Sequence, residues 1–138
     1  MRRHLDRLAE LESAWPAAAA GPSLLHGDLR ADNVLLTDSG GVVVDWPSAC
    51  TGAAWVDLLL ALPSVAMHGG GDPEALWAAY PPALGVDPAA ATAVLAAATG
   101  YFLHGSRQPP PPNLPLLREV QRAQGKVAVA WLRRRLRW

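Results

Sequence analysis

The chain has 138 residues, which is enough for one compact domain with a single apolar core. Hydrophobic residues make up 51% and charged residues 17% of it, and this balance excludes an intrinsically disordered protein. The formal net charge is zero, but residues 118–138 carry seven basic side chains against one acidic side chain, so the remainder of the chain is acidic.

Cysteine usage and hydropathy bear on where the protein works. The single cysteine, Cys50, rules out an internal disulfide and fits a reducing compartment. The charged opening segment, residues 1–12, does not resemble a secretory signal. The longest uncharged stretches, 58–67 and 89–103, fall short of the ~18 residues of a membrane span. We therefore expect a cytoplasmic protein with no membrane partner.

The first predicted elements are one helix and one β-hairpin. Leucines recur at helical spacing over residues 2–14, and the Pro- and Ala-rich stretch 16–22 is expected to end that helix. Branched apolar residues follow at 34–37 and 42–45, on either side of the turn sequence Asp-Ser-Gly-Gly at 38–41. This pattern predicts two antiparallel strands joined by a tight turn.

The rest of the chain has a helical pattern. Asp followed by Pro, a helix start signal, occurs at 72–73 and again at 87–88. Pro63 is expected to bend or end the helix in which it lies. The sequence shows no repeat and no second domain, so we predict one mostly helical α+β domain over residues 1–138. The predicted helices cover residues 55–67, 72–80, 87–104 and 114–137.

Polar side chains gather in one loop, residues 26–33, between two apolar runs; we call it the polar loop. Asp28 and Asn33 of this loop, with Asp45 at the end of the second predicted strand, offer the hard oxygen ligands that suit Mg²⁺. The tight turn would bring Asp45 back beside the loop. An aspartate near a metal-bound phosphate could accept a proton from an attacking hydroxyl, and Arg30 could stabilise phosphate oxygens.

The polar loop carries a family resemblance. Its sequence, HGDLRADN, has the spacing of the protein-kinase catalytic loop, and Gly in second place makes it similar to the aminoglycoside-phosphotransferase family of small-molecule kinases. Val42–Trp46 resembles that family's strand ending in Asp-Trp. Trp55–Leu58 resembles its following helix, whose Asp braces the catalytic loop. The resemblance covers roughly residues 20 to 62.

The resemblance implies a fold, an activity and residue roles. The fold would be a protein-kinase-like carboxy-terminal lobe, and the activity an ATP-dependent phosphorylation of a hydroxyl on a small molecule. Asp28 would be the catalytic base, and Arg30 lies where protein kinases usually carry a Lys near the transferred phosphate. Asn33 and Asp45 would hold Mg²⁺ against the nucleotide phosphates.

Two residues are expected to support the loop rather than to react. Asp57 would hydrogen-bond the loop backbone near His26, and His26 would pack beneath the loop as a buried structural histidine. Asp32 is expected to be exposed or to form a turn. Trp46 is expected in the core or in a cleft wall, and Cys50 is expected to be a small apolar filler.

One part of a kinase-like fold has no counterpart in the sequence. Such folds place a Gly-rich phosphate cover and a strand Lys before the catalytic loop. Only 25 residues precede His26, with one glycine, Gly21, and no lysine. We therefore expect a truncated or partial form without the amino-terminal lobe. The alternative is a non-catalytic remnant or binding module that self-associates or joins a missing lobe through its exposed cleft floor.

The basic final helix and the acceptor substrate remain open. Cations near the carboxyl end of a helix are favourable, which explains most of the basic pattern at 133–137. Because that helix shows no aromatic interleaving and no groove-reading motif, a nucleic acid is not the expected partner. Few acidic residues follow Asp57, which argues weakly against a polycationic aminoglycoside as the acceptor.

Overall fold

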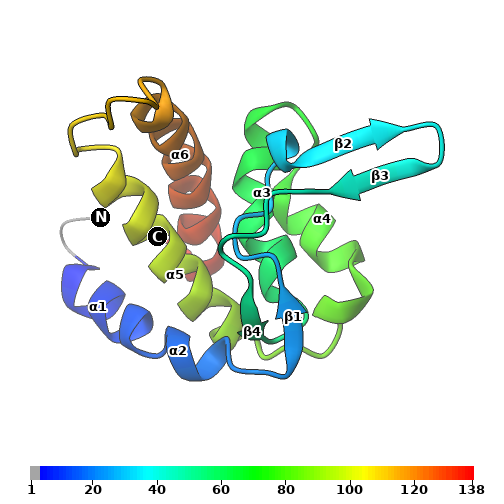
Figure 1. The fold of residues 1–138 in the computed structure, drawn as a ribbon. Helices are drawn as coiled ribbons and strands as arrows, with labels where there is room; N and C mark the ends of the chain where they lie inside the picture. The colour runs from blue at the N-terminus through cyan, green and yellow to red at the C-terminus, as the bar shows by residue number, and fades with distance from the viewer. Residues whose placement is uncertain (1–3) are drawn as a thin grey trace. The chain divides into compact units, whose positions relative to one another are not determined.

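The computed structural model describes residues 4–138 (Figure 1). The chain divides into two compact units, one containing the residues up to Ala18 together with Val86–Trp138, the other Ala19–Gly85. Helices dominate and the strands pair in two small antiparallel sheets, so the predicted mostly helical α+β class is confirmed. The expectation of one domain over 1–138 stays a prediction. No helix of the described chain is both long and apolar enough to cross a bilayer.

The first unit, which we call the helical unit, is built around one long alanine-rich helix. This central helix, α5, packs against the three other helices of the unit (Figure 1). It begins where the Asp-Pro signal predicts, because the Asp87 side chain accepts a hydrogen bond from Ala89 N at 2.9 Å. The helices are α1 (Leu5–Ser13), α2 (Trp15–Ala18), α5 (Pro88–Gly105) and α6 (Leu117–Leu136).

Apolar burial holds α5 and α6 together. Leu95 of α5 and Trp131 of α6 are completely buried. Small residues permit this close packing: a Cβ added to Gly105 would lie only 2.7 Å from the Gln121 side chain of α6. A polar contact accompanies the apolar ones, since Arg135 Nε donates to Thr92 Oγ1 across the helix pair at 3.2 Å.

The second unit, which we call the loop unit, contains both sheets. In it β1 (Ser23–Leu25) pairs with β4 (Cys50–Gly52), and β2 (Val34–Thr37) pairs with β3 (Gly40–Val43). Figure 1 shows β2 and β3 as a hairpin arm. The short helix η2 (Ala31–Asn33) leads directly into β2. The remaining elements are α3 (Val56–Met67), α4 (Pro73–Ala79) and η3 (Pro81–Ala83).

The structure corrects several predicted boundaries. The strand β3 begins at Gly40 and ends at Val43, so Asp45 lies two residues beyond it instead of ending it. Pro63 lies inside α3, which continues to Met67 as predicted, so Pro63 does not end this helix. Pro16 lies within α2, in the first turn, where its missing N–H costs little.

Other corrections concern burial and pairing. The pairing of β4 with β1 was not predicted, because Cys-Thr-Gly has no strand pattern and depends on a partner far along the chain. Cys50 is exposed, so its expected role as an apolar filler is wrong. Trp46 is 45% exposed and therefore lies outside the core.

Candidate active site

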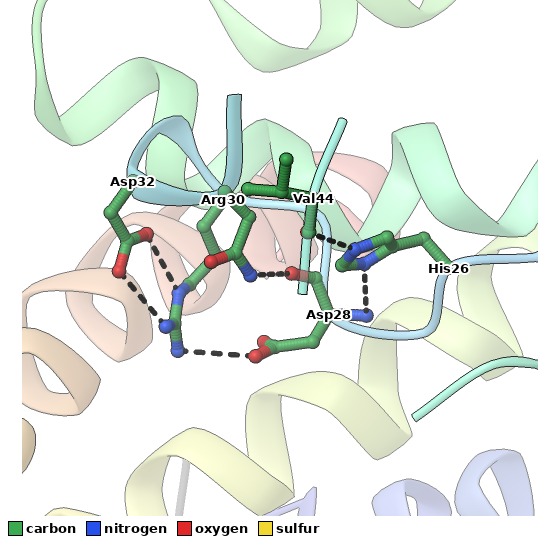
Figure 2. Close-up of polar contacts among 6 residues, drawn as sticks. His26, Asp28, Arg30, Asp32 and Val44 are labelled. Atoms are coloured by element: carbon green, nitrogen blue, oxygen red, sulfur yellow. Dashed lines mark hydrogen bonds and ion pairs between the residues drawn. The ribbon is translucent and has the colours of Figure 1, made fainter. Parts of the chain in front are cut away.

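A buried histidine organises the polar loop, which follows β1. His26 is only 2% exposed. Its Nε2 lies 2.9 Å from the carbonyl oxygen of Val44, and its Nδ1 accepts a hydrogen bond from Asp28 N at 3.3 Å (Figure 2). Because a carbonyl can only accept, these two partners together select the neutral tautomer with the proton on Nε2. His26 therefore links the loop to the segment that follows β3.

The first turn of α3 supports the same loop from another direction. Asp57 accepts hydrogen bonds from His26 N at 2.7 Å and from Gly27 N at 3.0 Å, each with a different carboxylate oxygen. Gly27 has a φ of 79°, and a Cβ there would lie 2.4 Å from Ser48 O, so only glycine fits. This geometry presents two successive backbone donors to one carboxylate.

Asn33 closes the loop on itself. It is 4% exposed, and its Nδ2 donates to the Asp28 carbonyl oxygen at 2.8 Å, which orients the side-chain amide. The backbone carbonyl oxygen of Asn33 accepts a hydrogen bond from Val44 N at 2.9 Å. No donor within residues 4–138 contacts Asn33 Oδ1. That oxygen is therefore available to a ligand.

Asp45 follows Val44, whose backbone N–H and C=O are both hydrogen-bonded to the polar loop. Val44 N donates to Asn33, and Val44 O accepts from His26. Asp45 itself has a left-handed φ of 64°, which is uncommon for a residue with a Cβ and tends to occur at functional sites. Its carboxylate is exposed and forms no hydrogen bond within the described chain.

Arg30 lies between two carboxylates (Figure 2). Its Nε and Nη2 donate to the two oxygens of Asp32, both at 3.0 Å, and its Nη1 lies 3.4 Å from Asp28 Oδ2. The hydrogen bonds to Asp32 raise the pKa of Arg30, and the charges of Asp28, Asp32 and Asp45 raise it further. In return, the hydrogen bond from Arg30 lowers the pKa of Asp32.

The donor set fits Mg²⁺. Mg²⁺ in phosphate sites is usually held by one or two carboxylates, with waters and substrate phosphates completing its shell. Asn33 Oδ1 and the Asp45 carboxylate offer hard oxygens of this kind. The described residues contain no group of three or more His, Cys, Asp and Glu side chains that could hold a metal alone.

Sequence reasoning missed one feature of this site. Asp32 is exposed, as expected, with 68% of its side chain accessible, but its bidentate pairing with Arg30 was not predicted. The signal was present, since opposite charges stand two residues apart at 30 and 32. Two residues apart do not face each other on an α-helix, and only the turn into η2 brings them together.

The sequence of the chain matches a known class of protein. The sequence pattern of the phosphotransferase enzyme family matches residues 2–91, which is more than half of the chain. The chain therefore belongs to this family of kinase-like enzymes, which confirms the resemblance of the polar loop. The match ends shortly after the start of α5, so α6 and most of α5 lie outside it.

One characterised relative makes the comparison more specific. A homoserine kinase from Methylobacterium sp. (strain 4-46) is 36% identical over 92 residues, which cover 62% of this chain and 28% of the relative. The chain thus spans less than a third of the length of that enzyme. No solved structure matches the chain.

Proposed function

We propose that this chain carries the catalytic loop of an ATP-dependent, cytoplasmic small-molecule kinase that phosphorylates a hydroxyl group. One observation carries the proposal: the backbone of Val44 is hydrogen-bonded to both His26 and Asn33, through its C=O and its N–H respectively. Those two bonds place the segment leading to Asp45 against the loop that contains Asp28. Family membership supports the reaction class.

Each residue then has a separate task. Asp28 would orient the acceptor hydroxyl and take its proton as the oxygen attacks the γ-phosphorus of ATP and ADP leaves, since Asp28 Oδ1 has no hydrogen-bond partner in the described chain. Asn33 and Asp45 would hold Mg²⁺, which supplies charge neutralisation for the nucleotide phosphates. Arg30 would provide a fixed positive charge beside the base. Phosphoryl transfer depends mainly on such positioning and charge.

The acceptor is proposed to be a small hydroxyl compound. The characterised relative is a homoserine kinase, so an amino acid with a side-chain hydroxyl is the first acceptor to test. The loop unit offers Asp72 and Glu74 as acidic residues after Asp57, which is a small number for binding a polycation. An aminoglycoside is therefore not the proposed acceptor.

A second function is favoured by one observation. The β2–β3 hairpin exposes apolar side chains from both strands, with Leu36 at 89%, Leu35 at 53% and Val42 at 46% accessible. Exposed apolar clusters often mark association surfaces. The rival proposal is therefore a non-catalytic module that associates through this hairpin, either with itself or with a nucleotide-binding lobe.

Calorimetric titration with ATP in the presence and absence of Mg²⁺ separates the two functions. The kinase proposal expects Mg²⁺-dependent binding that Asp45→Asn weakens by about tenfold or more, because one metal ligand loses its charge. Asp38→Asn is the matched control: it removes an exposed aspartate from the turn of the same hairpin, where asparagine fits equally well. Absence of binding to the wild-type protein at millimolar nucleotide would contradict the kinase proposal and favour the module.

A further inference from the structure

The pairing of Arg30 with Asp32 divides the guanidinium group into two edges. One edge, Nε and Nη2, meets both oxygens of Asp32 at 3.0 Å in a bidentate arrangement. The remaining amino group, Nη1, is left to face Asp28 Oδ2 at 3.4 Å. Figure 2 shows Arg30 between the two carboxylates, with Asp32 on one side and Asp28 on the other.

The ion pair between Arg30 and Asp32 is expected to contribute little to the stability of the fold. The Asp32 side chain is 68% exposed, and exposed ion pairs contribute little to folding. The geometry nevertheless has a consequence at Asp28. A guanidinium binds carboxylates best through two parallel hydrogen bonds, and Arg30 has already committed that edge to Asp32. Asp28 therefore meets Arg30 through a single longer contact, and its Oδ1 stays free for a substrate hydroxyl.

We propose that Asp32 is a positioning residue of the active site. It holds Arg30 so that the guanidinium provides positive charge near Asp28 without forming a bidentate pair with the Asp28 carboxylate. The inference rests on the proposed function, because it assigns Asp28 the task of accepting a proton. Without the Asp32 carboxylate, the guanidinium group of Arg30 is free to turn toward Asp28 and to donate two parallel hydrogen bonds to both Asp28 carboxylate oxygens. The base would then be blocked by the residue that now assists it.

The first test observes Arg30 directly and does not depend on activity. In ¹⁵N-labelled protein, the Arg30 Nε–H resonance should be protected from solvent exchange, because Nε–H is bonded to Asp32. Asp32→Asn should lower that protection by about tenfold. Asp32→Glu keeps a carboxylate at this position and should retain most of the exchange protection of Arg30 Nε–H. The control is Glu10→Gln, which removes another exposed arginine–carboxylate pair, Arg7–Glu10, in the helical unit.

The second test measures catalysis. Asp32→Asn should lower kcat by about tenfold with KM for ATP changed less than about twofold, since Arg30 then blocks the base while the proposed metal ligands remain. Lysine cannot form the bidentate pair, so in an Arg30→Lys background the Asp32→Asn change should have almost no further effect on kcat.

The outcomes distinguish this inference from the function on which it rests. Unchanged Arg30 exchange in Asp32→Asn, or a loss of kcat that is fully additive with Arg30→Lys, would overturn the positioning role. A wild-type protein without turnover would contradict the proposed kinase function. In that case, normal exchange protection that disappears in Asp32→Asn would still support the placement of Arg30 by Asp32.

Discussion

Different kinds of interaction stabilise the interior of each of the two units. In the helical unit, the α5–α6 pair buries large apolar side chains such as Trp131 and Leu95. In the loop unit, the polar loop depends on a few directed hydrogen bonds that involve the side chains of Asp57, His26 and Asn33. Apolar packing tolerates a hydrophobic substitution that keeps the volume, whereas a carboxylate that accepts one backbone donor on each of its two oxygens, as Asp57 does, loses a hydrogen bond even on isosteric replacement by asparagine.

The largest effect is expected in the helical core. Trp131→Ala should lower the free energy of unfolding by about 3–5 kcal/mol, because it removes a completely buried indole and leaves a cavity. Chemical denaturation measures the change. The matched control is Trp15→Ala, which removes a tryptophan of the same unit that is 44% exposed and should cost much less. Equal losses in both variants would contradict the assignment of the core.

A smaller effect on stability, but a larger one on the polar loop, is expected at Asp57. Asp57→Asn can accept only one of the two backbone hydrogen bonds from His26 and Gly27, because the second oxygen becomes an amide donor. The expected loss is about 1–3 kcal/mol. Hydrogen exchange should show the His26 and Gly27 amides losing protection first.

Asp87 offers a control for that substitution. Its side chain accepts one backbone hydrogen bond, from Ala89 N, at the start of α5. Asparagine is as good as aspartate at this helix position, so Asp87→Asn should change the free energy of unfolding by less than about 0.5 kcal/mol. Similar losses at positions 57 and 87 would show that charge, not the use of both oxygens, decides the effect.

The smallest effect on stability is expected at the hairpin. Leu36 is 89% exposed, so Leu36→Ser should leave the free energy of unfolding within about 0.5 kcal/mol of the wild-type value. If the hairpin mediates self-association, the same change should shift sedimentation toward the monomer at high protein concentration. A stability loss as large as that of Asp57→Asn would mean that the hairpin is buried in solution.

Local chemistry by itself determined several features of this protein. The turn sequence at 38–41 predicted the hairpin, and Asp-Pro predicted the starts of α4 and α5, because turns and caps depend on adjacent residues. The HGDLRADN motif and the Asp-Trp sequence that follows β3 indicated the family for the same reason: each motif is contiguous in the chain.

Tertiary structure alone decided the features that join distant or non-repeating positions. The pairing of β1 with β4, the left-handed conformation of Asp45 and the division of Arg30 between Asp28 and Asp32 have no periodic signal in the sequence. The strand pairing joins residues tens of positions apart, as the hydrogen bond from His26 N to Asp57 also does, and the Arg30–Asp32 contact requires the turn into η2. Short-range propensities determine which elements form, whereas the direction of a single side chain follows from the whole packed neighbourhood.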